Sequence, residues 1–180
     1  ALPPELSGPS EQEQIHHRNV LSTQITWPHR LQRNQQKTFK QWQVNPENQQ
    51  STNVCESIVD NLGKRHNPHL IVGEHGVGKS HLLHATGQSV LRYYDDDVRI
   101  VRATELLSMD ESPKDWHESL ASTALILIDD VHLIAEHKEH AQSLGHLVDH
   151  ALNLGVHVLC TSTSQPQGWT SSRLWELLRH

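Results

Sequence analysis

The sequence predicts an α/β protein in which a parallel sheet lies between two layers of helices, a three-layer arrangement. Short apolar runs typical of buried strands alternate with stretches of helical periodicity. One apolar run leads into a glycine-rich turn and a helix, and another ends in two adjacent carboxylates. Ligands of parallel α/β sheets bind outside the carboxyl ends of the strands, so we expect the functional site at that edge.

The composition limits the class of protein. The chain has 180 residues, enough for one domain with a sizeable core, and a formal net charge of -6. This charge argues against an overall basic nucleic-acid binder but is compatible with a local basic patch. No apolar run approaches the ~18 residues of a membrane span, and the start lacks a signal-peptide pattern. Cys55 and Cys160 have no metal-ligand spacing, so we expect buried free thiols in a cytoplasmic protein.

Residues 1–36 differ from the rest of the chain. They are rich in Pro, Gln and Ser with scattered apolar residues, and we interpret them as a flexible arm or linker before a nucleotide-binding core at residues 37–180. The apolar residues Ile25, Trp27 and Leu31 leave a second interpretation open, in which this segment docks on the core.

The core is expected to begin with a helix that follows Pro46 and ends at Gly63, since Val54, Ile58 and Leu62 have helical spacing. A short apolar strand at residues 69–72 follows it.

Residues 73–80 fit the P-loop pattern G-x-x-x-x-G-K-[S/T] at every fixed position, between a strand and a helix as that motif requires. Glycine permits backbone angles closed to other residues and leaves the amide groups open to an anion. We expect Lys79 to contact the β and γ phosphates and Ser80 to bind Mg²⁺. A chance glycine turn is the alternative. The predicted nucleotide-binding residues of the loop are Gly73, Glu74, His75, Gly76, Val77, Gly78, Lys79 and Ser80.

After the P-loop, the helix is expected to end before the acidic residues 95–97. A strand at 98–103 and a short helix from 104 come next, and a polar connection at 108–119 is interrupted by Pro113.

The most apolar run of the chain, residues 124–128, is expected to form a buried central strand, and it ends at Asp129 and Asp130. A carboxylate in this position completes a P-loop site, because it holds Mg²⁺. We assign Asp129 to Mg²⁺ and expect Asp130 to orient or deprotonate the attacking water. The alternative for Asp130 is to cap the next helix.

An amphipathic helix at 141–152 is expected to end at Gly155 and to precede a buried strand at 156–161. A polar residue after this strand, within 162–166, is expected to touch the γ-phosphate or the water. The site would then be assembled from three adjacent strand tips.

The chain contains sixteen histidines, which raises the hypothesis of a metal site. The pairs His81/His84 and His146/His150 have helical spacing, but no third ligand with recognisable spacing follows them. We favour a solvated histidine-rich surface. A metal-sensing protein that has lost nucleotide binding is the remaining alternative.

With these segments in place, residues 37–180 resemble an AAA+ ATPase of the bacterial replication initiator DnaA family. Residues 38–48 follow its pattern T-F-x-x-F-x-V-G-x-x-N, and residues 66–68 and 80–85 resemble N-P-L and T-H-L-L-H-A. Residues 127–132 are similar to its Walker B segment, L-I-D-D-[IV]-[QH].

The resemblance implies a P-loop AAA+ fold that binds ATP or ADP with Mg²⁺. It implies slow hydrolysis and nucleotide-controlled assembly in replication initiation or its regulation, with other replication proteins, self-association and single-stranded DNA as partners. It also implies further nucleotide contacts from Val44, Asn45, Asn48 and His81 and a catalytic contact, called sensor 1, at Thr163.

Two departures weaken the catalytic part of the resemblance. Thr163 stands where the family has Asp or Asn, and Leu177 stands in place of the arginine finger. Arg173 matches an earlier arginine, and Arg179 fits only if the register slips. A non-catalytic nucleotide-binding regulator and a helicase-loader-type ATPase are therefore alternatives to an active ATPase.

Two further departures concern DNA. The connection at 108–119 is shorter than the family's helical insertion that contacts single-stranded DNA, and the sequence ends at His180, before the family's helical lid and its helix-turn-helix. Recognition of duplex DNA is therefore not implied for this chain.

Overall fold

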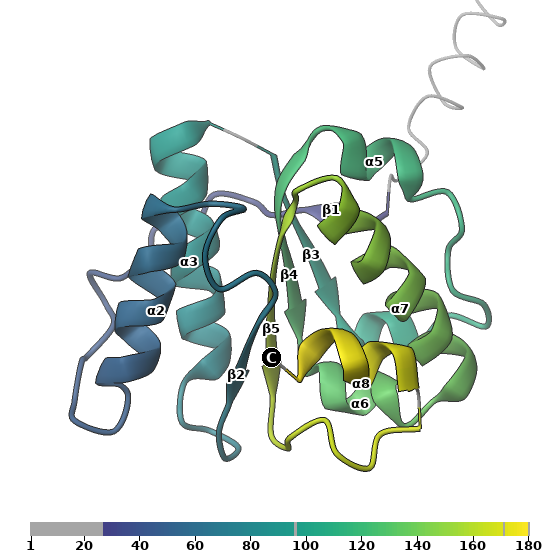
Figure 1. Cartoon of the computed structure of the whole chain (residues 1–180). Coiled ribbons are helices and arrows are strands. Elements are labelled where there is room, and N and C mark those ends of the chain that lie inside the picture. Colours follow the sequence, from purple (N-terminus) through teal and green to yellow (C-terminus); the bar gives the residue numbers. More distant parts are fainter. Residues whose placement is uncertain (1–26, 96, 171, 180) are drawn as a thin grey trace, which may run out of the picture.

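The computed structural model describes residues 27–95, 97–170 and 172–179, which form one five-stranded sheet with helices on both faces (Figure 1). Its strand order is β1-β3-β4-β5-β2. The strands are β1 (His29–Arg30), β2 (His69–Val72), β3 (Asp97–Arg102), β4 (Thr123–Asp129) and β5 (His157–Ser162). β2, β5, β4 and β3 are parallel, and β1 pairs antiparallel with β3. The α/β fold predicted from the sequence is confirmed.

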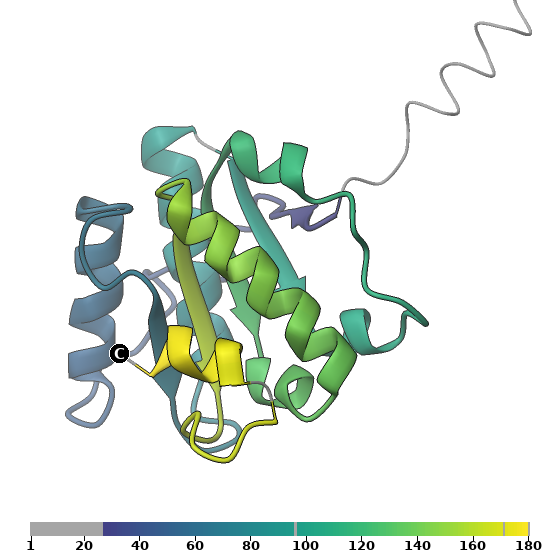
Figure 2. The same cartoon turned by 45° about the vertical axis from the view of Figure 1, so that its right-hand side comes forward.

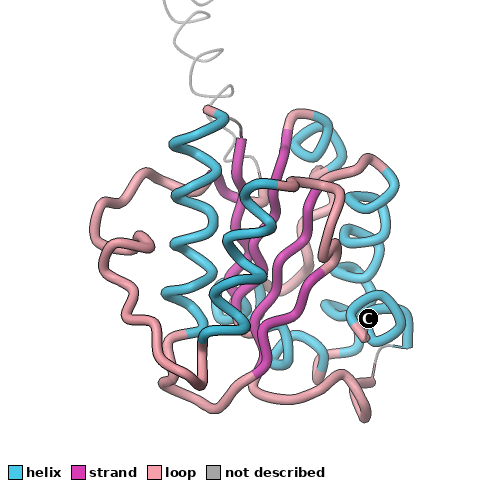
Figure 3. The backbone as a smooth tube through the Cα atoms, turned by 60° about the vertical axis from the view of Figure 1, so that its left-hand side comes forward, coloured by secondary structure: helices cyan, strands magenta, loops and turns pink. Residues whose placement is uncertain are grey.

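The helices form two layers. One layer contains α2 (Gln49–Asp60) and α3 (Lys79–Tyr94). The other contains α4 (Ala103–Leu107), α5 (His117–Ala121), α6 (Val131–Ala135), α7 (Lys138–Asn153) and α8 (Ser172–Leu178). Figure 2 and Figure 3 show that these layers cover opposite faces of the sheet.

The central strand β4 belongs to both hydrophobic clusters of the core. Leu125 and Leu127 pack in the cluster that includes α2 and α3, whereas Ile126 and Ile128 pack in the cluster under α4 to α8. Successive side chains of a strand point to opposite faces, so a strand covered on both sides is apolar at every position. Residues 124–128 are therefore all apolar because β4 is covered on both faces.

The segment before residue 37 is packed on the core from Trp27 onward. Trp27 and Leu31 are both buried, but in the two different clusters, because the chain crosses the sheet edge at β1. The Leu31 N–H donates to the Val98 carbonyl oxygen (2.8 Å), and Arg99 Nη1 donates to the Pro28 carbonyl oxygen (2.8 Å). The docking interpretation therefore describes this part of the arm, while Ile25 and the rest of residues 1–26 lie outside the described residues.

The main helices and strands lie where the sequence predicts them, within a few residues at their ends. Three short helices were not predicted: α5, which begins in the polar connection, α6, which follows the acidic pair, and α8, which follows the loop after β5. The two-residue strand β1 was not predicted either. Helices of this length are too short to display helical periodicity, and packing rather than propensity stabilises them. In α5 the anchor is the buried side chain of Trp116, which precedes its first residue.

Cys55 and Cys160 are free and buried, as predicted. Burial raises the pKa of both thiols, that of Cys55 to about 12. Within the described ranges, every helix is too short or too polar to span a bilayer.

Candidate functional site

The sheet order brings the predicted site segments to one edge. The P-loop follows β2, and β4 ends at Asp129, the first residue of the acidic pair. The strand β5 lies between β2 and β4. Asp129 is therefore not on the direct neighbour of the P-loop strand. Ile128 pairs with Cys160, so the next residues of β4 and β5, Asp129 and Thr161, lie side by side at the tips.

The P-loop has the backbone conformation that its glycines allow. Gly76 and Gly78 have φ angles of 82° and 100°, a region that favours glycine. A Cβ atom on Gly78 would lie 2.7 Å from the ring of Trp42, which therefore packs directly on the loop. Trp42 is held in turn by its Nε1–H, which donates to Thr52 Oγ1 (2.9 Å).

Lys79 is the first residue of α3, and only 8% of it is exposed. Its ammonium donates to the Glu74 carbonyl oxygen (2.6 Å), a backbone acceptor of the P-loop itself. An ammonium has three donors, and an ion removed from water needs acceptors for them. The loop thus encloses a positive charge that has capacity for an anion.

Asp129 is the centre of a hydrogen-bond network that joins the end of β4 to β5 and to the start of α3. Ser80 Oγ and Thr161 Oγ1 both donate to Asp129 Oδ1, at 2.9 Å and 2.6 Å. One carboxylate with two hydroxyl groups is an all-oxygen donor set of the kind that Mg²⁺ prefers. The residues predicted to hold the metal, Ser80 and Asp129, are therefore in direct contact, and their chemistry fits the ion.

Thr161 is a member of this network that sequence reasoning missed. It is fully buried, and its Oγ1 also accepts the Asp130 N–H (2.9 Å), which fixes the backbone of the second acid. A signal was present in the sequence, since Thr161 is a polar residue directly after the apolar residues 158–160. Its contact with Asp129, however, depends on the register of β4 and β5.

Asp130 occupies the N-cap position of α6 in a left-handed conformation, with φ 57°. Its side chain makes no capping hydrogen bond to that helix, so the capping alternative is not observed for its carboxylate. Strained backbone at such a position is often associated with function.

Thr163 is exposed and lies beyond the end of β5. Its backbone N–H donates to His132 Nδ1 (3.2 Å), which ties the loop after β5 to α6.

A cavity of about 210 Å³ adjoins the P-loop, and Asn45 and Asn48 belong to its wall. The two asparagines bond reciprocally: the Asn45 N–H donates to Asn48 Oδ1 (2.9 Å), and the Asn48 N–H donates to Asn45 Oδ1 (2.9 Å). The lining residues are Trp42, Asn45, Glu47, Asn48, Ser51, Ile71, Val72, Gly73, Glu74, Val77, Lys79 and Leu82. The wall is thus fixed in place beside the phosphate loop.

Several predicted contacts lie apart from this cavity. Val44 is 50% exposed, and neither it nor His81 is among the lining residues. The His81 ring stands 5.4 Å from the Trp42 ring, and its Nε2–H donates to the Thr38 carbonyl oxygen (3.1 Å). His81 therefore supports the segment that carries Trp42. His75 is exposed on the P-loop.

His84, one turn beyond Ser80 on α3, is buried. Desolvation lowers the pKa of His84 to about 4, and the charge of Lys37 lowers it further, against an opposing effect of Asp129. The imidazole is neutral near pH 7 and does not neutralise Asp129.

The sequence profile described as "Bacterial DnaA ATPAse domain" matches residues 33–174. The chain belongs to this DnaA family. A replication initiator DnaA from Nautilia profundicola is 28% identical over 138 residues, which are 72% of this chain and 31% of that protein. This chain therefore spans about a third of the length of such relatives.

Solved DnaA structures share the fold. A structure described as a DNA replication initiation factor has a TM-score of 0.72 and 25% identity, over 81% of this chain and 47% of that one. AMPPCP-bound DnaA from Aquifex aeolicus has a TM-score of 0.68 and 25% identity, over 79% and 47% of the two chains. The resemblance to DnaA AAA+ domains read from the sequence motifs is confirmed.

Among the described residues, no group of three or more His, Cys, Asp or Glu side chains is arranged to hold a metal ion.

Proposed function

We propose that this DnaA-family chain binds ATP or ADP together with Mg²⁺ and serves as a nucleotide-dependent module in replication initiation or its regulation. The observation that carries the proposal is the hydrogen bond between Ser80 and Asp129, which joins the P-loop helix to the acidic strand across the tip of β5. Hydroxyl and carboxylate in contact behind a phosphate-binding turn form the metal half of a P-loop site.

The chain's own groups divide the work of binding. The backbone N–H groups of the P-loop and the ammonium of Lys79 would bind the phosphates, with Lys79 exchanging its carbonyl partner for phosphate oxygens. Ser80 and Asp129 would hold Mg²⁺, which supplies positive charge against the phosphate oxygens when bound. The cavity beside Asn45 and Asn48 would receive the base. The AMPPCP bound to the Aquifex aeolicus relative supports adenine as that base.

Hydrolysis, where it occurs, would use Asp130 to orient the attacking water. Thr161 fixes the Asp130 backbone, and no capping bond engages the carboxylate. Turnover is expected to be slow, because an arginine finger contributes about 10³ to 10⁵ in related P-loop enzymes and Leu177 stands at its position.

One observation favours the non-catalytic regulator as a second candidate. Arg173, which matches an arginine of the family pattern, forms ion pairs with Asp149 on α7 and Glu176 on α8. An arginine held by two carboxylates of its own chain is less available to stabilise charge on a nucleotide.

Calorimetry with ATP and a turnover assay separate these functions. An ATPase binds ATP and releases phosphate in a Mg²⁺-dependent way that Lys79→Ala and Asp130→Asn abolish. A regulator binds nucleotide tightly without turnover. Equal, slow phosphate release by the wild type and both variants would exclude hydrolysis, and no affinity for adenine nucleotides would exclude the whole proposal.

Assembly and DNA contact are proposed on the family resemblance. We expect ATP, compared with ADP, to promote self-association or contact with other replication proteins and to strengthen binding to single-stranded DNA. Sedimentation of the chain with each nucleotide, with and without an oligonucleotide, tests both. Identical sedimentation under all four conditions would contradict nucleotide control.

A further inference from the structure

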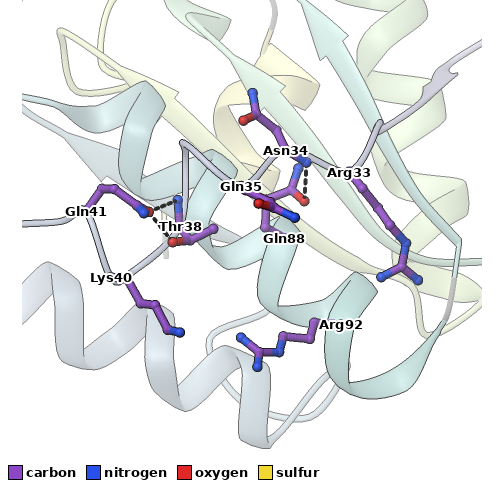
Figure 4. A pocket seen from close by; sticks show the side chains of 8 residues that line it. All are labelled: Arg33, Asn34, Gln35, Thr38, Lys40, Gln41, Gln88 and Arg92. Atoms are coloured by element: carbon purple, nitrogen blue, oxygen red, sulfur yellow. Dashed lines mark hydrogen bonds between the residues drawn. The ribbon is translucent and has the colours of Figure 1, made fainter.

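A second cavity, of about 550 Å³, lies beside the second half of α3, where Gln88 and Arg92 belong to its lining (Figure 4). Three cationic side chains and no carboxylate belong to its lining. The lining residues are Arg33, Asn34, Gln35, Thr38, Lys40, Gln41, Gln88 and Arg92. None of them is a residue of the P-loop.

Hydrogen bonds hold the walls of this cavity in place. Gln88 accepts the Asn34 N–H at its Oε1 (2.9 Å) and donates its Nε2–H to the Gln32 carbonyl oxygen (2.8 Å), which fastens the segment before Thr38 onto α3. On the opposite wall, Gln41 Oε1 accepts hydrogen bonds from the backbone N–H and hydroxyl group of Thr38. The cavity is therefore built by specific contacts.

The three cations differ in their partners. Arg33 donates to the Leu91 carbonyl oxygen (3.3 Å) and to Asp95 (2.8 Å), so its charge is matched. Within the described residues, the side chains of Lys40 and Arg92 form no hydrogen bond or ion pair. The Arg92 guanidinium lies 6.0 Å from the centre of the Tyr93 ring. Figure 4 shows the charged ends of Lys40 and Arg92 turned toward the same space from opposite walls. Two like charges converging on one hollow favour an anion between them.

An adjoining cavity of about 390 Å³ shares Thr38, Lys40, Gln88 and Arg92 with the first. Its remaining wall contains the aromatic rings of Phe39 and Tyr93 and the carboxylates of Glu56 and Asp60. Tyr93 is 71% exposed, so its ring is open to a planar group.

These features favour a ligand with one anionic end. The carboxylates repel a second phosphate from the aromatic side, but they accept hydrogen bonds from neutral N–H or O–H groups. Aromatic side chains next to cations are the usual means by which proteins bind a base and its phosphate.

We propose that this groove binds one nucleotide unit, with its phosphate between Lys40 and Arg92 and its base against Tyr93 and Phe39. The phosphate ester is either that of a free mononucleotide or one link of a single strand. No residue of the P-loop lines this groove.

The groove also has a structural route to the P-loop. The Thr38 carbonyl oxygen accepts the His81 Nε2–H (3.1 Å), and Trp42, at the end of the same turn, packs on Gly78. A ligand that orders residues 38–42 would thus stabilise the support of the P-loop.

The test uses the full chain carrying Lys79→Ala, a substitution that removes nucleotide binding at the P-loop. Any binding that remains is then due to another site, so the groove is tested separately from the P-loop. The probes are dTMP and an oligothymidylate of about eight nucleotides, within the span of ssDNA sites. Adding Lys40→Ala and Arg92→Ala is expected to weaken binding about tenfold, because charge-assisted hydrogen bonds to phosphate are lost. Calorimetry gives the affinities, and the amide NMR shifts of residues 38–42 and 88–93 locate the ligand.

Lys64→Ala with Arg65→Ala is the matched control. It removes the same charge from exposed residues that line neither cavity. Its affinity for dTMP and the oligothymidylate should equal that of the chain carrying Lys79→Ala alone. Binding of dTMP assigns the site to a free nucleotide, and binding of the oligonucleotide alone assigns it to a strand. Both conclusions require that Lys40→Ala with Arg92→Ala weakens the binding. Binding of neither probe, or equal weakening in both double variants, overturns the proposal. If the groove double variant melts early, Arg92→Gln alone decides by the same comparison.

Discussion

The two ends of the parallel sheet both carry buried polar side chains, yet they use them differently. At the carboxyl ends of the strands, Ser80 and Thr161 donate to Asp129, so side chains bond to one another. At the amino ends, Asn67 and His157 bond to the backbone.

The amino-end network uses both ring nitrogens of His157 and both the N–H and the oxygen of the Asn67 amide. His157 Nδ1 accepts the Gly63 N–H (3.0 Å), so Nε2 carries the proton and donates to the His66 carbonyl oxygen (2.8 Å). Asn67 donates to the Val156 carbonyl oxygen (3.1 Å) and accepts the Val158 N–H (2.9 Å). These bonds fasten the turn before β2 to the start of β5.

The carboxyl-end network leaves part of its hydrogen-bonding capacity unused. Lys79 has a single backbone acceptor among the described residues, and the side chain of Asp130 is not used as a cap. We therefore expect the amino-end groups to serve stability and the carboxyl-end groups to serve ligand binding. Substitutions at the two ends should separate stability from ligand affinity.

The largest expected effect is that of Lys79→Ala at the carboxyl end. Loss of the ammonium removes charge-assisted bonds worth about 3 kcal/mol, or about 100-fold in ATP affinity. The free energy of unfolding should change by less than about 1 kcal/mol. Calorimetric titration and urea denaturation measure the two quantities, and a large loss of stability with unchanged affinity would reverse the comparison.

His157→Leu at the amino end should do the opposite. The Gly63 N–H and the His66 carbonyl oxygen would lose their partner in the interior, which costs about 2 to 3 kcal/mol of stability. ATP affinity of the folded protein should stay within about twofold, a difference well below 1 kcal/mol. His146→Leu, an exposed control, should cost under about 0.5 kcal/mol in urea denaturation. Equal costs would show that the backbone bonds of His157 contribute little.

The pH dependence of stability tests the same network. Desolvation lowers the pKa of His157 from 6.5 to about 4, against the opposing effect of its bond to the His66 backbone. As the pH falls below 6.5, the unfolded chain takes up a proton that the native imidazole excludes, so stability falls until about pH 4.

For His157 this loss amounts to about 2 kcal/mol between pH 7 and pH 5. Desolvation also lowers the pKa of His69 and of His84 to about 4, which adds loss in the same direction. Urea denaturation at a series of pH values should give a flatter profile for His157→Leu than for the wild type. Identical slopes would mean that His157 titrates normally in the native state.

The smallest expected effect is that of Thr161→Val, which preserves the side chain's shape but removes its hydroxyl from the Asp129 network. Phosphate release should fall about fivefold, the equivalent of about 1 kcal/mol, because Asp130 loses the acceptor for its N–H. ATP affinity should change less than turnover. A change confined to affinity would mean that Thr161 serves binding alone.

Local patterns in the sequence were sufficient for most of the fold. Neighbouring residues specify the P-loop at residues 73–80, the apolar strand that ends at Asp129 and the strand that follows α7. Docking of Trp27 and Leu31 on the core was one of two interpretations, the other being a flexible arm. A few scattered apolar residues do not show whether the core offers a surface on which they can pack. The helices α5, α6 and α8 were missed because they are too short for periodicity.

The site was predicted as a set of residue types, and its contacts were not. The sequence by itself determined that a phosphate-binding turn and two acids would meet at the carboxyl ends of strands, since chain direction and strand parallelism follow from local alternation. Only the tertiary structure decided that β5 lies between them, that Thr161 touches Asp129 and that Val44 stays outside the cavity. Strand order and the pairing of Asp129 with Thr161 arise from packing between distant segments, whereas local periodicity shows which face a residue takes but not which strand lies beside it.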